Sequence, residues 1–443
     1  MGNGFSCATL TDGTVQCWGL NGNGQLGDGT TTDRSTPVQV SGITTATQVS
    51  FGTVHACATL TDGTIECWGE NFYGRLGDGT TTDRSTPVQV SGITTATHVS
   101  VSDDRHSCAL LTDGTVQCWG HNSRGQLGDG TTTDSSTPVQ VSGITTAAQV
   151  SSGDSHSCAA LQDGTVQCWG YNPYGQLGDG TTTTRSTPVQ VSGITTATQV
   201  SASHQHSCAT LQDGTVQCWG VNGNGQLGDG TTTTRSTPVQ VSGITTATQV
   251  SSGDEHTCVT LQDGTVQCWG ANGNGQLGDG TTTDRSTPVQ VSGITTATQI
   301  SLGYTHSCAI LQDGTMKCWG ENFYGQLGDG TNSDSATPVQ VSGITTAGTL
   351  TSPPPPNPPP PNPPPPNPPP LSESANRLKL TKDEIVGIAV GSFAFVILVF
   401  LCARRNAIRR AARVQRIIVS QQIKQVGGAG LPLGAHVIQV QRD

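Results

Sequence analysis

The chain repeats one sequence unit seven times along most of its length. The copies follow one another at intervals of 50 residues, with a single interval of 51 between Cys57 and Cys108. One copy, residues 195–243, reads TTATQVSASHQHSCATLQDGTVQCWGVNGNGQLGDGTTTTRSTPVQVSG. Self-similarity of this length is typical of solenoids, propellers and arrays, in which each copy is one structural unit.

Four stretches in each copy alternate small or apolar residues with polar ones, which is typical of β-strands. Between the second and third, Asp213-Gly214 is a tight-turn signal, because glycine adopts the positive φ that such turns need. Pro238 is expected to open the fourth strand at a blade edge, where its missing N–H does least harm. Seven such units predict an all-β fold, a seven-bladed β-propeller with four-stranded blades. In this copy the expected strands are Thr198–Ser201, His206–Leu211, Thr215–Gly220 and Thr237–Val241.

The first copy begins after the position of its own first strand, whereas an extra copy of that strand, TTAGTLT, stands at Thr345–Thr351. We expect this last segment to complete the first blade, because ring closure removes two exposed sheet edges. The predicted propeller therefore covers residues 1–351.

Fourteen of the fifteen cysteines form seven pairs whose members are ten residues apart. The turn Gln212–Gly214 would place Cys208 opposite Cys218, so the turn and the cysteine spacing agree. Disulfides indicate an oxidising compartment. The alternatives are free thiols or zinc, but zinc needs four converging ligands and one histidine near each pair is the only further candidate. The predicted disulfides are Cys7–Cys17, Cys57–Cys67, Cys108–Cys118, Cys158–Cys168, Cys208–Cys218, Cys258–Cys268 and Cys308–Cys318.

The segments CALLTDGTVQCWGHNSRGQLGDGT (from Cys108) and HSCAALQDGTVQCWGYNPYGQLGDGT (from His156) resemble the regulator of chromosome condensation repeat family. That family also includes a bacterial β-lactamase inhibitor protein (protein II), a plant UV-B photoreceptor and ubiquitin ligases. The resemblance implies a seven-bladed propeller. It does not transfer a function, because one propeller scaffold hosts unrelated activities.

The repeated polar and aromatic residues are interpreted as structural. We expect each Trp of the CWG motif to pack beside its own disulfide between blades, rather than to form a chromophore. The histidine two residues before the first cysteine is expected to bond a backbone carbonyl rather than a metal. The Asn-rich loops, with Asp229 as the only acid in one of them, favour turns over calcium sites. The sequence shows no nucleophile paired with a base and no phosphate loop, so we predict no enzyme activity, no metal and no cofactor.

The copies differ from one another mainly in two loops, the one before the His-x-Cys motif and the one after CWG. In an up-and-down meander these two loops emerge on the same side, so the variable residues gather on one face. Aromatic residues and arginine are the types that anchor interfaces, although loop tips also vary without a function. The predicted ligand-binding face consists of Phe72, Tyr73, Arg75, Arg105, Arg124, Tyr171, Tyr174, Tyr304, Phe323 and Tyr324.

Residues 352–384 are a Pro-rich stalk and juxtamembrane linker, with PPPPNPPPPNPPPPNPPP at 353–370. A polyproline II run of this length, at ~3.1 Å per residue, extends over roughly 55 Å. It resembles the hydroxyproline-rich stalks of green-algal and plant wall glycoproteins, which suggests an extracellular matrix. A docking site for SH3-type domains is the alternative, and it would require cytosolic exposure.

Residues 385–403 contain no charged side chain over nineteen positions, which is enough for one transmembrane helix. The arginine-rich residues 404–443 follow, so the positive-inside rule predicts a cytoplasmic tail and an extracellular propeller at the plasma membrane. Gly387 and Gly391 form a GxxxG motif, a candidate contact for a homodimer. Cys402, at the inner edge of the span, is a candidate lipidation site. No signal peptide precedes residue 1, so we expect one upstream of this sequence.

The charge is distributed unevenly. Residues 1–372 contain 9 Lys and Arg against 27 Asp and Glu, a formal charge of −18, whereas residues 404–443 contain 8 against 1, a charge of +7. The acidic domain excludes nucleic acid as a partner, and the basic tail favours an anionic inner leaflet. We expect a single-pass cell-surface protein whose propeller binds a protein or glycan ligand. The alternatives are a structural cell-wall or matrix component and a membrane-attached intracellular regulator, such as a guanine-nucleotide exchange factor or a ubiquitin-ligase adaptor.

Overall fold

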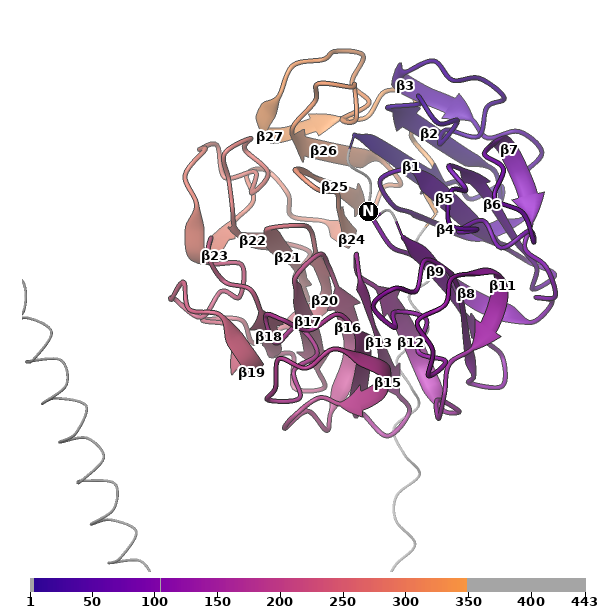
Figure 1. The fold of residues 1–443 in the computed structure, drawn as a ribbon. Helices are drawn as coiled ribbons and strands as arrows, with labels where there is room; N and C mark the ends of the chain where they lie inside the picture. Colours follow the sequence, from indigo (N-terminus) through magenta and orange to yellow (C-terminus); the bar gives the residue numbers. More distant parts are fainter. Residues whose placement is uncertain (1–3, 104, 349–443) are drawn as a thin grey trace, which may run out of the picture. The chain divides into compact units, whose positions relative to one another are not determined.

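The computed structural model describes residues 4–103 and 105–348, which form seven antiparallel sheets arranged in a ring (Figure 1). Strand order follows the chain within every sheet, and the ring is therefore the predicted seven-bladed β-propeller. The strands of blades 1 to 4 are β1 Phe5–Thr9, β2 Val15–Gly19 and β3 Arg34–Gln39; β4 Ala46–Phe51, β5 His55–Leu60, β6 Ile65–Gly69 and β7 Arg84–Gln89; β8 Ala96–Val101, β9 His106–Leu111, β10 Val116–Gly120 and β11 Ser135–Gln140; and β12 Ala147–Ser152, β13 His156–Leu161, β14 Val166–Gly170 and β15 Arg185–Gln190. The strands of blades 5 to 7 are β16 Ala197–Ala202, β17 His206–Leu211, β18 Val216–Gly220 and β19 Arg235–Gln240; β20 Ala247–Ser252, β21 His256–Leu261, β22 Val266–Gly270 and β23 Arg285–Gln290; and β24 Ala297–Leu302, β25 His306–Leu311, β26 Met316–Gly320 and β27 Ser335–Gln340.

The outermost strand of each blade differs from the prediction. In blade 5 it begins at Arg235, so Pro238 lies inside β19 instead of opening it. The register between β18 and β19 shifts between Cys218 and Gly220, next to the proline. A proline is tolerated there because β19 is an edge strand and the irregularity removes the need for its N–H.

The first part of the expected closing strand pairs with blade 1. Ala347 forms an antiparallel bridge with Leu10, and the Gly348 N–H donates to the Thr9 carbonyl at 2.9 Å. Blade 1 is otherwise three-stranded within the described residues. The rest of that strand, Thr349–Thr351, lies outside them, as do the predicted stalk, transmembrane helix, basic tail, Gly387, Gly391 and Cys402. In the part of the chain that the structure describes, no helix is long and apolar enough to span a bilayer.

All seven predicted disulfides are present, and they tie the second strand of each blade to the third. The register places each cysteine directly opposite its partner, as for Cys208 and Cys218. Each disulfide therefore reinforces a hairpin that its tight turn already aligns.

A hydrophobic core fills every junction between blades, and the seven tryptophans are fully buried there. The prediction that each Trp packs beside its own disulfide is wrong. Trp68 shares a core with Cys7 and Cys17 of the preceding blade. Since neighbouring residues of a strand point to opposite faces, Cys67 and Trp68 cannot face the same junction. The Trp68 Nε1–H donates to the Gln25 carbonyl of the preceding blade at 2.9 Å.

The innermost strands surround a narrow polar channel of about 180 Å³. Their unpaired backbone N–H groups donate to side chains of the preceding blade: the Val200 N–H to Gln149 Oε1 at 2.8 Å and the Ala202 N–H to Ser151 Oγ at 2.9 Å. These bonds satisfy the strand edges around the channel. A channel this small is below the usual volume of about 300–1,000 Å³ for an organic ligand, so we place the candidate site elsewhere.

Candidate ligand face

The loops that follow the first and third strands of each blade lie together on one side of the ring. Backbone bonds join them: the Glu70 N–H donates to the Val54 carbonyl, and the His121 N–H to the Arg105 carbonyl, both at 2.9 Å. The tight turns and the links between blades meet on the opposite side. We call these sides the loop face and the turn face. The expected gathering of both variable loops on one face is therefore present.

Each loop after the third strand is built around a buried asparagine. In blade 2, Asn71 Oδ1 accepts the Leu76 N–H at 2.9 Å, and Asn71 Nδ2 donates to the Thr80 carbonyl at 3.1 Å. Asp78 Oδ1 accepts the Thr80 N–H at 2.9 Å. Partial burial opposes ionisation of Asp78, but the bonds from Thr80 and from Arg84 hold the pKa of this carboxyl below its usual range. The side-chain oxygens of Asn71 and Asp78 therefore accept hydrogen bonds from the loop's own backbone. No group of three or more metal-binding side chains occurs among the described residues.

Two phenylalanines project from this scaffold. Phe72 is 65% exposed and Phe323 is 67% exposed, at the same position of blades 2 and 7. Each ring stands edge-on to the following tyrosine, Tyr73 or Tyr324, with ring centroids 4.7 and 4.8 Å apart. Tyr174 of blade 4 is 41% exposed. Blades 7, 1 and 2 are consecutive in the ring (Figure 1). The loops that carry the two Phe–Tyr pairs, in blades 7 and 2, therefore lie on the two blades beside blade 1.

Several variable residues contact each other across blade junctions instead of facing outward. Tyr73 stacks on His121 of the next blade with ring centroids 4.3 Å apart. The Arg124 guanidinium carbon lies 4.9 Å from the centre of the Tyr171 ring. At these two junctions, variable residues of neighbouring blades therefore contact each other in pairs.

Arg75 takes a different role from the one predicted. Its side chain is buried, with 2% of the residue exposed, and it lies over the Tyr73 ring and 3.5 Å from Glu70. It occupies the place that glutamine holds in the other copies. Arg75 therefore supports the loop from below and does not offer its guanidinium to a partner.

A polar network crosses five consecutive blades on the loop face, near the channel. Arg105 donates to both oxygens of Asp154 at 3.0 and 3.1 Å. His204 lies between Asp154, at 3.7 Å, and Asp254, at 2.6 Å. The bond to Asp254 raises the pKa of His204 to about 9, against the effect of burial. Burial and a hydrogen bond to Asp254 raise the pKa of Tyr304.

This network joins two predicted residues, Arg105 and Tyr304, through three that the sequence interpretation did not name: Asp154, His204 and Asp254. The sequence did contain a pattern, because four of these five residues stand two residues before the repeat histidine of their own blades. The pattern alone does not show that the residues contact one another, because only ring closure brings loops about 50 residues apart together.

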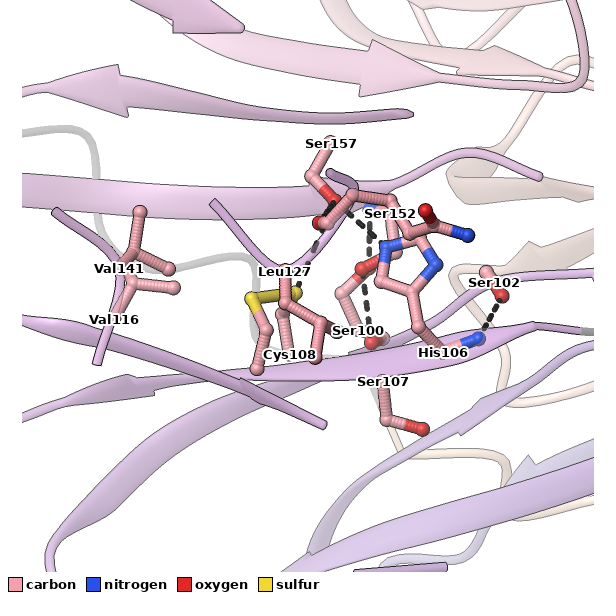
Figure 2. The surroundings of a disulfide bond; sticks show 12 residues. Ser100, Ser102, His106, Ser107, Cys108, Val116, Leu127, Val141, Ser152 and Ser157 are labelled. Atoms are coloured by element: carbon pink, nitrogen blue, oxygen red, sulfur yellow. Dashed lines mark hydrogen bonds between the residues drawn. A yellow bond between two sulfur atoms is a disulfide. The ribbon is translucent and has the colours of Figure 1, made fainter. Parts of the chain in front are cut away.

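The repeat histidines lie beneath this face and join the blades. His106 Nε2 lies 2.7 Å from Ser157 Oγ of the next blade, close to the disulfide of Cys108 (Figure 2). The Ser157 hydroxyl donates its one hydrogen to the Gln126 carbonyl at 3.1 Å, so it accepts from His106. The expectation of a bond from the histidine to a backbone carbonyl is therefore wrong, because the hydroxyl lies between the ring and the carbonyl. Burial lowers the pKa of His106 to about 3, which keeps the ring neutral.

Comparison with protein families gives one consistent result. The model described as RCC1-like domain matches residues 104–352, which is more than half of the chain. The model of the regulator of chromosome condensation (RCC1) repeat matches residues 12–59 and 62–110. No curated protein matches the chain.

Solved structures of similar fold include human WBSCR16, with 23% identity, a TM-score of 0.67 and coverage of 74% of this chain and 94% of that one. Yeast RCC1 (Prp20) in complex with Kap60 has 20% identity and a TM-score of 0.66, over 76% and 85% of the two chains. Prp20p from Saccharomyces cerevisiae, studied with its binding to Gsp1p and histones, has 20% identity and a TM-score of 0.65, over 76% and 87%. At these identities the likeness shows a shared fold.

Proposed function

Because the chain belongs to the family of RCC1-like domains, we propose that its propeller is a protein-binding module and that the partner binds the loop face. The similar yeast protein Prp20p has binding properties to Gsp1p and histones, which makes protein binding the expected use of such a ring. On this proposal the propeller holds a partner and catalyses no reaction.

The observation that carries the proposal is the pair of exposed phenylalanines, Phe72 and Phe323. The same position holds glycine, serine or proline in the other five copies, so the scaffold does not need an aromatic ring there. Removal of an exposed apolar ring from water is favourable. A partner that covers the ring therefore gains binding free energy. Aromatic anchors of this kind dominate the energetics of protein interfaces.

The surroundings of the two rings also suit a binding surface. Each phenylalanine rests on a tyrosine that packs against the neighbouring blade, Tyr73 on His121 and Tyr324 beside Gly4, so the anchors are held in place before a partner arrives. A preorganised surface binds more tightly because less conformational entropy is lost on binding. The network from Arg105 to Tyr304 provides charged and hydroxyl groups on the same face.

We test the assignment of the face with two matched variants of the full chain. In the first, Phe72→Ser and Phe323→Ser place on both loops the residue found at Ser123. In the second, Gln212→Ser and Gln262→Ser change exposed side chains on the turn face. We expect proteins recovered by affinity capture from the native cells to be lost with the first variant and retained with the second. Loss with only the turn-face variant would refute the assignment.

We further propose that the protein is displayed at the cell surface, with residues 385–403 as its single span. The seven disulfides support an oxidising compartment, and the basic residues 404–443 favour a cytoplasmic tail. Protease added to intact cells should remove the propeller and leave the tail intact. A propeller that becomes accessible only after cell lysis would contradict this topology and favour an intracellular regulator.

A further inference from the structure

The outermost strand of every blade carries an exposed threonine directly before its proline. Blade 2 reads Ser85-Thr86-Pro87, and the Thr-Pro step recurs in all seven copies. The residues before this step do change, because Ser135 replaces arginine in blade 3 and Ala336 replaces serine in blade 7. We call the seven threonines the rim threonines, since the outermost strands form the rim of the ring (Figure 1). They are Thr36, Thr86, Thr137, Thr187, Thr237, Thr287 and Thr337, and all of them are exposed.

The methyl group of each rim threonine faces the preceding blade. A Cβ added at Gly29 of blade 1 would lie 3.7 Å from Cγ2 of Thr86, and the corresponding distances at the seven junctions are 3.6 to 3.8 Å. The hydroxyl group shares the Cβ with this methyl group and therefore points elsewhere. Packing against the preceding blade thus requires only the methyl group, which valine would supply equally well.

The hydroxyl groups of the rim threonines have no partner in the part of the chain that the structure describes. Other recurring threonines use theirs within the fold. In blade 2, Thr64 Oγ1 donates to Asp62 at 2.6 Å, and Thr80 Oγ1 donates to Asp78 at 2.8 Å. The rim hydroxyl is therefore a nucleophilic group that is open to solvent and not needed by the fold.

We propose that the rim threonines are acceptor sites for O-linked sugars, which a glycosyltransferase adds from a sugar nucleotide. Threonine oxygen Oγ1 attacks C1 of the sugar, and the bond from C1 to the phosphate oxygen breaks. The nucleoside diphosphate leaves, and the hydroxyl proton passes to a base of the transferase. Threonine beside proline is typical of O-glycosylated segments, and a residue before proline is held in an extended conformation. The inference rests on the proposed display at the cell surface, because transferases of this kind act on chains in the secretory pathway.

The position of the rim threonines leaves both faces of the ring free. Thr86 is the third of the six residues of β7, so it lies midway between the loop face and the turn face. Pro87 has no N–H to donate, which hinders another strand from pairing with this edge and covering the acceptor. Sugars at these positions would surround the ring and still allow a partner to reach Phe72 and Phe323.

One tryptic peptide contains both an expected acceptor and its internal control. Residues 85–105 follow Arg84 and contain Thr86 together with Thr94 and Thr95, which are also exposed but lie in a turn and do not precede proline. The full chain is purified from its native cells, and the peptide is fragmented by electron transfer, which leaves sugars attached. We expect the added mass of one or more sugars on Thr86 and none on Thr94 or Thr95. An unmodified Thr86, or equal modification of all three, would overturn the proposal.

The sequence makes any sugar on this chain simple to interpret. Residues 1–443 contain no Asn-x-Ser/Thr acceptor for an N-linked glycan. In the full chain, Thr86→Val keeps the methyl group beside Gly29 and removes the acceptor, so residues 85–105 should lose their sugar. The matched variant Thr94→Val should keep it. A sugar that persists in Thr86→Val would overturn the assignment.

Protease treatment of the same intact cells separates this inference from the proposed display. If protease removes the propeller from intact cells and Thr86 is unmodified, glycosylation of the rim is refuted and the display stands. If the propeller becomes accessible only after lysis, the display is contradicted, and the inference is overturned with it.

Discussion

Phe5 of blade 1 and Ala56 of blade 2 pack in one hydrophobic core, at the one junction of the described ring where no histidine bonds a hydroxyl of the next blade. The other six junctions use that bond, from His306 to Ser6 at 2.9 Å, for instance. Phe5 stands where the other copies have histidine, and Ala56 stands where they have serine or threonine. The two exceptions therefore compensate each other: loss of the donor on one blade coincides with loss of the acceptor on the next.

This relationship predicts how a second junction responds to the same exchange. Ser157→Ala alone should destabilise the fold by about 1–3 kcal/mol, because it leaves the buried His106 N–H without its acceptor. The double change His106→Phe with Ser157→Ala, which copies the pair Phe5 and Ala56, should cost less than the sum of the two single changes. Urea unfolding of the four proteins measures this coupling, and strictly additive effects would argue against compensation.

The buried histidines predict acid sensitivity. Burial lowers the pKa of His106, His156 and His256 to about 3, and that of His206 and His306 to about 4. In the unfolded chain histidine has a pKa of about 6.5. Between pH 6.5 and about 4 the unfolded state therefore binds more protons, and stability falls as the pH falls, by about 1.4 kcal/mol per pH unit for each histidine. Unfolding midpoints measured from pH 4.5 to 7 check the slope, which should be shallower in the double variant His106→Phe with Ser157→Ala.

His204 predicts that the stability of the fold decreases as the pH rises into the alkaline range. Its pKa in the folded protein is raised to about 9, chiefly by the bond to Asp254. Its contribution is therefore complete below about pH 6.5 and is lost as the pH rises through 9. Solvent screening reduces the size of the effect, because the His204 side chain is 35% exposed. Thermal midpoints at pH 7 and 9.5 should differ less in His204→Gln than in the wild type, and an equal difference in both would contradict this role.

Two glycines of one repeat, Gly228 before β19 and Gly243 after it, provide a matched test of packing. Gly228 and Gly243 both have positive φ, 68° and 73°. An added Cβ at Gly228 would lie 2.7 Å from Nε1 of Trp269, whereas at Gly243 it would meet nothing within 4 Å. Gly243→Ala should cost about 1–2 kcal/mol of backbone strain, and Gly228→Ala about 1–3 kcal/mol more because it also overpacks the core. Similar unfolding free energies for the two variants would show that Trp269 can shift to make room for the added methyl group without loss of stability.

The repeat determined most of the fold from the sequence alone. Its period, its strand pattern and its cysteine spacing specify seven identical hairpins, because pairing within a blade depends on residues close together in the chain. The same locality explains why the disulfides of the hairpins, such as Cys208 with Cys218, were predicted correctly. It also explains why both variable loops could be assigned to one face from topology alone.

Contacts between blades could not be read in this way. The sequence shows that Trp68 and His106 recur in the repeat and that Arg75 replaces a recurring glutamine. It does not show that each contacts the neighbouring blade, because those partners are about 30 to 50 residues away. Phe72 and Arg75 stand three residues apart in one loop, yet Phe72 is exposed and Arg75 is buried. Only the packing shows that Phe72 can contact a partner and that Arg75 supports the loop.

The sequence by itself therefore determined the blade, the number of blades and the covalent links within each blade, since these follow from local pattern and spacing. Only the tertiary structure decided which side chains join one blade to the next and which of the variable residues reach solvent. The physical reason is that ring closure brings distant copies into contact, and the environment of a side chain depends on that contact.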